Sequence, residues 1–171
     1  FGRIGRLILR ALLENYKGKI QVVGINDLGS IEANAHLIKF DSTHGTLNHD
    51  VKTTKDGFQI GDQNIKVFAE RDPAKLPWGK IGADVVLECT GFFLDKKSAG
   101  KHIDAGTKKV IISAPAKEVD FTVVQGVNSK DLKKEHNIIS NGSCTTNCLA
   151  PVAMVLENNF GIEYGYMTTI H

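Results

Sequence analysis

Apolar residues recur along this chain in two patterns, short continuous runs and runs with helical spacing, and the two alternate. The continuous runs predict buried strands, at residues 20–25, 83–89, 109–113, 121–127 and 137–140. The helical runs lie between and after them, at residues 7–13, 31–40, 96–105 and 149–156, with a short helix around residues 131–132. Continuous apolar strands that alternate with helices indicate an α/β protein with a mostly parallel sheet covered on both faces.

One segment, residues 51–68, departs from this pattern because apolar and polar residues alternate along it. Two turn-forming pairs interrupt it, Asp56-Gly57 and Gly61-Asp62. Alternation broken by such turns predicts antiparallel hairpins. We therefore expect a small antiparallel part beside the parallel strands.

Composition excludes several classes of protein. The chain has 171 residues, enough for one core or slightly more. With 42% apolar and 23% charged residues it has the composition of a soluble globular protein, and no apolar stretch approaches the roughly 20 residues that span a membrane. A net charge of +2 is too small to indicate nucleic-acid binding. Three cysteines, two of them one helical turn apart, form no disulfide framework, so we expect a reducing compartment, the cytoplasm.

The strongest candidate for chemistry is Cys144, in the segment SNGSCTTNC at residues 140–148. The segment ends an apolar run and opens a helical one, so the thiol lies at a helix N-terminus, where unpaired N–H groups and the helix dipole favour the nucleophilic thiolate. Ser143 and Thr145 flank it with hydroxyls that cap the helix or bind an anion. Buried cysteines are usually inert, so a structural role stays open for Cys144. We interpret Cys148, one turn further on, as a packing residue.

Polar residues end four of the predicted strands, and we expect them to lie along one rim of the sheet. They are Asn26-Asp27, Thr90-Gly91, Ser113 and Ser140-Asn141. In open parallel sheets, ligands bind outside the carboxyl ends of the strands. This rim is therefore the predicted ligand-binding edge.

Residues 2–5, Gly-Arg-Ile-Gly, correspond to the last part of the dinucleotide fingerprint G-x-G-x-x-G. A helix follows, then a strand, and Asp27 ends that strand 22 positions after Gly5. Glycine lets the backbone approach a pyrophosphate, the helix N-terminus stabilises its charge, and a carboxylate binds ribose hydroxyls and repels a 2′-phosphate. This arrangement favours NAD over NADP and a Rossmann-type doubly wound sheet. The structural alternative for Asp27 is a turn-forming Asn-Asp pair.

Seven segments, in this order, resemble the phosphorylating glyceraldehyde-3-phosphate dehydrogenases. They are residues 1–6, 26–27, 40–45, 89–91, 112–115, 140–148 and 168–171. The resemblance covers the whole chain and is most specific around Cys144. It implies an NAD-binding domain over residues 1–143, without its first strand, and the start of a truncated α+β catalytic domain over residues 144–171. Both ends cut through motifs, so we expect a fragment of a longer gene product.

The resemblance also implies the roles of individual residues. Cys144 is the nucleophile that attacks the aldehyde of glyceraldehyde 3-phosphate, and His171 is the base that assists it. Inorganic phosphate, held with the help of Ser143 and Thr145, releases the thioester as 1,3-bisphosphoglycerate after hydride transfer to NAD, a step of glycolysis and gluconeogenesis. The implied cofactor contacts are Gly2, Arg3, Ile4, Asn26, Asp27, Arg71, Thr90, Gly91, Phe93 and Ser113.

The resemblance implies that the full-length protein is a homotetramer. We expect no membrane association, no nucleic-acid partner and no metal site. Phe93 is expected near the adenine and Ser113 near the nicotinamide. The other histidines show no ligand set and are interpreted as structural or exposed. They are His36, His44, His49, His102 and His136.

Two other functions remain as alternatives. An erythrose-4-phosphate dehydrogenase tends to carry Asn-Glu where this chain has Asn26-Asp27, and it hydrolyses the thioester instead of using phosphate. A non-catalytic NAD- or RNA-binding protein built on the same domain would be expected to lose the nucleophile or the base, yet Cys144 and His171 are both present.

Overall fold

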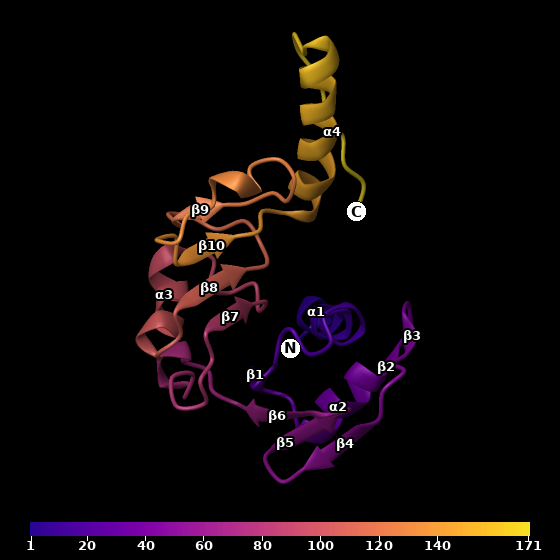
Figure 1. Cartoon of the computed structure of the whole chain (residues 1–171), viewed down its shortest axis with the longest axis vertical. Helices are drawn as coiled ribbons and strands as arrows, with labels where there is room; N and C mark the ends of the chain where they lie inside the picture. The colour runs from indigo at the N-terminus through magenta and orange to yellow at the C-terminus, as the bar shows by residue number, and fades with distance from the viewer.

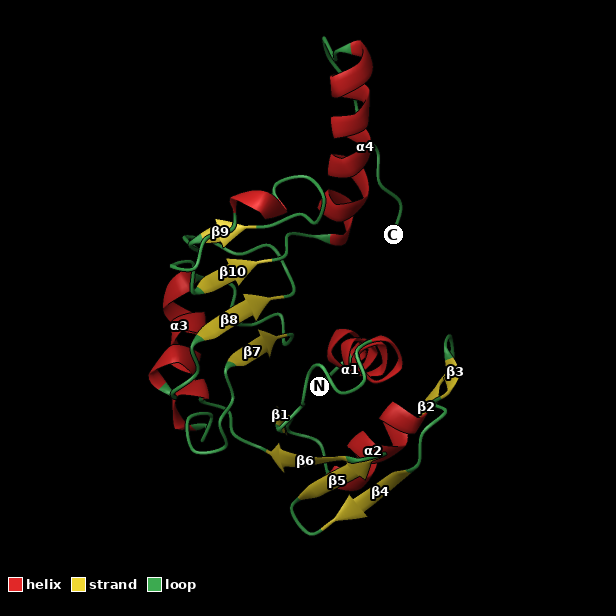
Figure 2. Cartoon of the chain, in the orientation of Figure 1, coloured by secondary structure: helices red, strands yellow, loops and turns green.

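The computed structural model describes residues 1–171 as two four-stranded sheets, a two-stranded ribbon and four α-helices (Figures 1 and 2). The helices are α1 (Arg3–Asn15), α2 (Ile31–Lys39), α3 (Lys96–Asp104) and α4 (Cys144–Phe160), with 3-10 turns η1 (Pro73–Lys75) and η2 (Ser129–Asp131). The strands are β1 (Gly24–Asn26), β2 (Phe40–Asp41), β3 (Gly45–Thr46), β4 (Val51–Thr54), β5 (Gly57–Ile60), β6 (Gln63–Phe68), β7 (Val85–Glu88), β8 (Lys109–Ile112), β9 (Phe121–Thr122) and β10 (Ile138–Ser140). The predicted α/β class is confirmed.

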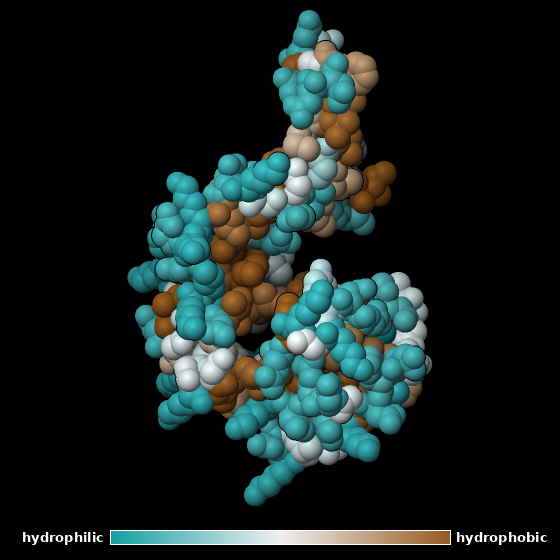
Figure 3. Space-filling view, viewed as in Figure 1, coloured by the Kyte–Doolittle hydropathy of each residue, from teal (hydrophilic) through white to brown (hydrophobic).

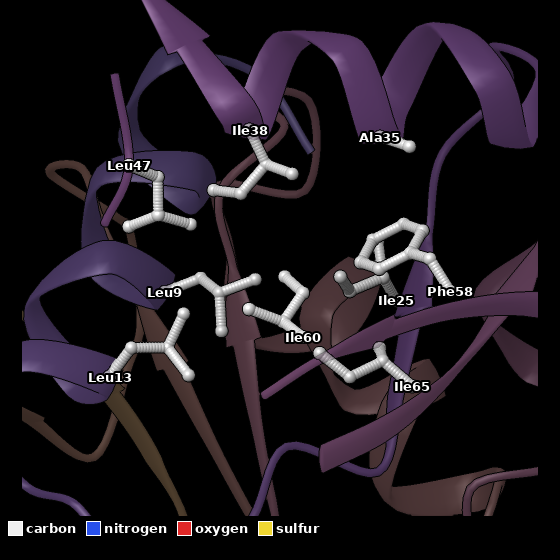
Figure 4. Close-up of a cluster of buried hydrophobic side chains, with 9 residues drawn as sticks. All are labelled: Leu9, Leu13, Ile25, Ala35, Ile38, Leu47, Phe58, Ile60 and Ile65. Atoms are coloured by element: carbon white, nitrogen blue, oxygen red, sulfur yellow. The ribbon is translucent and has the colours of Figure 1, made fainter. Parts of the chain in front are cut away.

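The first sheet has the strand order β1-β6-β5-β4. Strands β4, β5 and β6 form two antiparallel hairpins, as the alternating pattern predicted, while β1 pairs with β6 in parallel. Gly57 is required where β5 meets β6, because a Cβ there would lie 2.0 Å from the carbonyl oxygen of Ile65. Helices α1 and α2, with the residue after β3, complete this core (Figure 4), whose members are Leu9, Leu13, Ile25, Ala35, Ile38, Leu47, Phe58, Ile60 and Ile65.

A buried arginine stabilises the junction of α1 and α2. Arg10 is only 5% exposed, and its guanidinium donates to the carbonyl oxygens of Ile38 (2.8 and 3.1 Å), Lys39 (3.1 Å) and Gly45 (3.0 Å). The first two carbonyls belong to the C-terminal turn of α2, where the helix dipole favours a cation. Backbone oxygens therefore take the place of a carboxylate partner.

The second sheet, β7-β8-β10-β9, is entirely parallel. Helix α3 packs on one face, where its Ala99 forms a buried cluster with Val110, Ile112 and Ile138 of the sheet. The predicted stop of this helix at Gly106 is confirmed by the positive φ of +103° at that glycine. This sheet and its helix supply the parallel part of the predicted fold.

Three strand predictions are wrong in detail. The strand expected over residues 20–25 begins only at Gly24, and the strand over 121–127 ends at Thr122, because turns and backbone bonds to Val124 follow it. The second sheet is not covered on both faces, since Val85 and Leu87 of β7 remain 47% and 42% exposed. Figure 3 shows apolar surface in the hollow between the two sheets.

Helix α4 extends away from the body of the molecule, and residues 161–171 run back along it in the view of Figure 1. It is longer than the predicted 149–156 run, and none of its 17 residues is buried. The packing role predicted for Cys148 is not seen in this structure, because its thiol is exposed. Neither α4 nor any other helix is long and apolar enough to cross a bilayer.

Candidate active site

Cys144 is the first residue of α4 and its thiol is exposed. Strand β10 leads into it through a tight turn, in which Gly142 has a left-handed φ of +66°. The hydroxyl of Ser140 fixes that turn, since it donates to the Ala114 carbonyl oxygen (2.8 Å) and accepts from the Gly142 N–H (3.1 Å). The predicted placement of the thiol at a strand-to-helix junction is confirmed.

Ser143 is the N-cap of α4, and its hydroxyl oxygen accepts from the Thr146 N–H at 2.9 Å. Of the two roles open to Ser143, capping or anion binding, the structure shows the cap. Thr145 is half-buried and its hydroxyl makes no hydrogen bond within the chain, so it remains free for a ligand. Asn147 adds a clamp that the sequence pattern does not reveal, because its amide donates to the carbonyl oxygens of Asn141 (2.7 Å) and Ser143 (2.9 Å).

The structure does not bring His171 into hydrogen-bonding contact with Cys144. Its Nε2 atom lies 2.8 Å from the hydroxyl of Thr169, and the residue is exposed at the end of the chain. Burial, helped by the nearby charge of Glu88, raises the pKa of the thiol of Cys89, the third cysteine. Of the two exposed thiols, Cys144 is the one at the start of α4.

The start of α1 fits a dinucleotide phosphate. Its cap residue, Gly2, offers no side-chain acceptor, so the first N–H groups of the helix keep their hydrogen-bonding capacity. A Cβ on Gly2 would meet nothing within 4 Å, so the backbone there is open to close approach. A group with negative charge is favoured at this position by the helix dipole.

Asp27 lies directly beside this helix start. Its carboxylate accepts from the Gly29 N–H at 2.8 Å and from the side-chain amide of Asn34 at 3.4 Å. An ionised carboxylate next to a helix N-terminus matches the geometry that a bound ribose and pyrophosphate require.

Three further predicted contacts surround these residues. Asn26 exchanges two hydrogen bonds of 2.9 Å with the backbone of Glu70, which ties the end of β1 to the segment after β6. Arg3 is half-exposed and pairs with Asp41, while Ile4 is exposed on the first turn of α1. Arg71 is exposed and follows Glu70, close in sequence to that tie.

The remaining predicted contacts lie at the carboxyl ends of β7 and β8. Thr90 and Gly91 follow β7 and are exposed, and Gly91 has a left-handed φ of +76° with open space where a Cβ would stand. The N–H of Ser113, after β8, donates to the backbone oxygen of Glu88 at 3.0 Å. Phe93 is half-buried, with its ring edge toward His102.

The predicted rim is therefore present along the second sheet. The register pairs Glu88 with Ile112 and Ile112 with Ser140, so the three neighbouring strands end together. The helix α1 reaches the same place, because a Cβ built on Gly5 would lie 3.8 Å from the Cβ of Cys89. The start of α1 and the end of β7 therefore lie close together, and we take them with Asp27 as the candidate cofactor site; the thiol follows β10 at the carboxyl edge of the second sheet.

Comparison with known proteins gives two matching families. Residues 1–96 match the family described as glyceraldehyde 3-phosphate dehydrogenase, NAD binding domain, and residues 143–171 match its C-terminal domain. The predicted division after residue 143 stays a prediction.

Curated relatives match over the whole chain. The chain is 54% identical over 171 residues to a glyceraldehyde-3-phosphate dehydrogenase of Xanthobacter flavus, of which it covers 51%. It is 54% identical to the enzyme of that name from Clostridium pasteurianum, also covering 51%, and 55% identical over 172 residues to that of Zymomonas mobilis, again covering 51%. The chain thus spans about half the length of the curated relatives it matches.

Proposed function

This chain belongs to the glyceraldehyde 3-phosphate dehydrogenase family, and on that basis we propose that the protein oxidises glyceraldehyde 3-phosphate to 1,3-bisphosphoglycerate with NAD and inorganic phosphate. The observation that carries the proposal is the exposed thiol of Cys144 at the first position of α4, on the rim that also holds the candidate cofactor residues. The reaction belongs to glycolysis and gluconeogenesis.

The Cys144 sulfur attacks the carbonyl carbon of the aldehyde, and the imidazole of His171, which is bonded to Thr169 and not to Cys144 in this structure, would take up the thiol proton. The N–H groups at the start of α4 face the oxygen that gains negative charge, and such oriented donors stabilise an oxyanion. Loss of the aldehyde hydrogen as hydride leaves a thioester on Cys144. Covalent catalysis of this kind divides one difficult oxidation into two easier steps.

Phosphate then attacks the thioester carbon, the carbon–sulfur bond breaks, and the thiolate of Cys144 returns. The free hydroxyl of Thr145 supports its assignment to phosphate binding. Ser143 would bind phosphate only while sharing the hydroxyl that caps α4, so its larger contribution is to fix the helix start. The same helix N-terminus attracts the phosphate dianion.

NAD, when bound, supplies the hydride acceptor. Gly2, Arg3 and Ile4 would hold its pyrophosphate at the start of α1, and Asp27 would bind ribose hydroxyls. The loop after β7 and Ser113 complete the site, with Asn26 and Arg71 beside it; the loop residues are Thr90, Gly91 and Phe93. The open backbone at Gly2 and the carboxylate of Asp27, held by the Gly29 N–H, both support this fit.

A homotetramer and a cytoplasmic location complete the proposal. The three cysteines are free thiols, which agrees with a reducing compartment. Light scattering of the full-length protein measures the number of subunits.

The test is NADH formation by the full-length protein with glyceraldehyde 3-phosphate, with and without inorganic phosphate. We expect strong dependence on phosphate and loss of activity in Cys144→Ser, while the matched variant Cys148→Ser remains active. Activity indifferent to phosphate would indicate the hydrolytic alternative, an erythrose-4-phosphate dehydrogenase. NAD binding without any oxidation would indicate the non-catalytic alternative.

A further inference from the structure

A buried network of hydrogen bonds between three side chains lies next to Thr90. It joins Trp78 of the loop before β7, His102 of α3 and Glu88 at the end of β7. The Nε1 atom of Trp78 donates to Nδ1 of His102 at 3.0 Å, and Nε2 of His102 lies 2.9 Å from Oε2 of Glu88. The three residues are 5%, 4% and 3% exposed, so the network is shielded from solvent.

In this network each residue donates to the next, from Trp78 to His102 and from His102 to Glu88. An indole N–H only donates, so Nδ1 of His102 must accept and the neutral imidazole carries its proton on Nε2. That proton is donated to Glu88, whose two oxygens both accept, which requires the ionised carboxylate. Burial raises the pKa of the Glu88 carboxyl, but hydrogen bonds from His102 and Thr90 outweigh it and lower the pKa overall. Trp78 thus fixes the tautomer of His102 and, through it, the acceptor role of Glu88.

Glu88 connects this hydrogen-bond network to the candidate cofactor site. Its Oε1 atom accepts from the Thr90 N–H at 2.7 Å, and its backbone oxygen accepts from the Ser113 N–H. The ring of His102 meets the ring of Phe93 in an edge-on contact with centroids 6.3 Å apart. Three proposed cofactor contacts are therefore held by residues that are themselves too deeply buried to touch a cofactor.

We propose that Glu88 is a positioning residue for the cofactor loop, residues 90–93, and that Trp78 and His102 act on this loop by orienting the carboxylate. This inference rests on the proposed function, because it requires NAD to contact the loop. A role in packing alone would depend on the volume of these side chains. A positioning role depends on the order of donors and acceptors, and the two are separable by substitution.

The substitution Glu88→Gln keeps the volume and disturbs that order. If the glutamine oxygen accepts from Thr90, its NH2 group faces His102, which must then move its proton to Nδ1, against the N–H of Trp78. If the amide is turned over, its NH2 group faces the N–H of Thr90 and the loop loses its acceptor. Each arrangement contains one buried donor–donor contact, and such an unsatisfied donor is costly.

A second substitution removes the conflict. In Trp78→Phe no indole N–H remains, so His102 can carry its proton on Nδ1 and accept from the glutamine NH2 group at Nε2. The double variant Trp78→Phe/Glu88→Gln then contains no donor–donor contact between His102 and Thr90, and the Nδ1 N–H of His102 lacks an acceptor just as Nδ1 lacks a donor in Trp78→Phe alone. Two changes that each remove a native interaction are therefore expected to compensate each other, which a loss of packing does not produce.

The experiment measures the Kd of NAD by calorimetry for the full-length protein and its variants. We expect Glu88→Gln to weaken NAD binding by about tenfold, and the double variant to bind within about threefold of Trp78→Phe. The KM for glyceraldehyde 3-phosphate should stay unchanged, and the matched control Glu135→Gln, at an exposed glutamate, should bind NAD like the natural protein. NMR chemical shifts of the His102 ring nitrogens should show the proton on Nε2 in the natural protein and on Nδ1 in the double variant.

Unchanged NAD binding in Glu88→Gln, or a double variant that binds NAD about tenfold or more weakly than Trp78→Phe, would overturn the inference. If Glu88→Gln alone does not fold, the double variant and Trp78→Phe become the decisive pair, and a difference of about tenfold or more between them refutes the compensation. A natural protein that binds NAD but oxidises no glyceraldehyde 3-phosphate refutes the proposed reaction and leaves the variant comparison intact. One that binds no NAD overturns both.

Discussion

Replacing Arg10 by methionine tests whether backbone oxygens alone stabilise a buried cation at the junction of α1 and α2. Methionine keeps most of the apolar length of the side chain and removes every donor. The carbonyl oxygens of Ile38, Lys39 and Gly45 then lose hydrogen bonds of 2.8 to 3.1 Å inside a region where Arg10 is 5% exposed.

The magnitude follows from that count. A hydrogen bond to a charged donor contributes about 1.5–3 kcal/mol, and the contributions within one group are not additive. Part of the loss is regained because the guanidinium no longer has to be desolvated, and because some of the freed carbonyls reach water. We therefore expect Arg10→Met to lower the free energy of unfolding by about 3 kcal/mol, close to the effect of one strong interaction lost without replacement.

Urea unfolding of the full-length protein measures this difference, with Arg3→Met as the matched control. The ion pair of Arg3 with Asp41 is half-exposed, so its loss should cost no more than about 1 kcal/mol. Hydrogen exchange locates the effect, since amides of residues 38–47 should exchange faster in Arg10→Met. Equal stability of the two variants, or unchanged exchange there, would refute the assignment of Arg10 as the stabilising cation.

Three further predictions concern single contacts. Gly57→Ala brings a Cβ to 2.0 Å from the Ile65 oxygen and should lower the free energy of unfolding by about 2 kcal/mol or more; a melting temperature equal to that of the natural protein would contradict this. Ser143→Ala removes the N-cap of α4 and should cost about 1 kcal/mol of helix stability, seen as faster exchange in its first turn, while Ser143→Asp should restore the protection. The hydrogen bond from Lys96, with two backbone N–H groups, lowers the pKa of Asp120 to about 2, so its stabilisation is present above the ordinary value of 3.8 and is lost as the pH falls toward 2. Asp120→Asn should flatten the loss of stability across that interval, and an unchanged acid titration would show that this carboxylate makes no such contribution.

The local pattern of apolar and polar residues predicted the helices and strands of this fold better than it predicted which of their faces are buried. The alternation of residues 51–68 and the stop at Gly106 each depend on neighbours in sequence, and both are present in the structure. The apolar residues of β7 predict a buried strand. Whether a helix covers a given face of a sheet depends on tertiary packing, and Val85 remains exposed.

The candidate site divides in the same way. Cys144 is identified by its own segment, since the turn and the cap lie within a few residues of it. Glu88 could not be identified as a positioning residue, because its partners, Trp78 and His102, are 10 and 14 positions away on other elements. The one local signal is a carboxylate inside an apolar run, which by itself does not say what neutralises it.

The exposed helix α4 links the accessibility of the Cys144 thiol to the surroundings of the helix. None of its residues is buried, and an isolated helix of 17 residues held mainly by its N-cap is only marginally stable in water. Cys144 therefore lies on the element whose order depends most on whatever covers the apolar side chains of Leu149, Val152 and Leu156. As that surface becomes covered, the first turn should stop fraying, and the rate at which an alkylating reagent labels Cys144 should change with it. The rate at which the Cys144 sulfur is labelled would then report how far the apolar surface of α4 is covered.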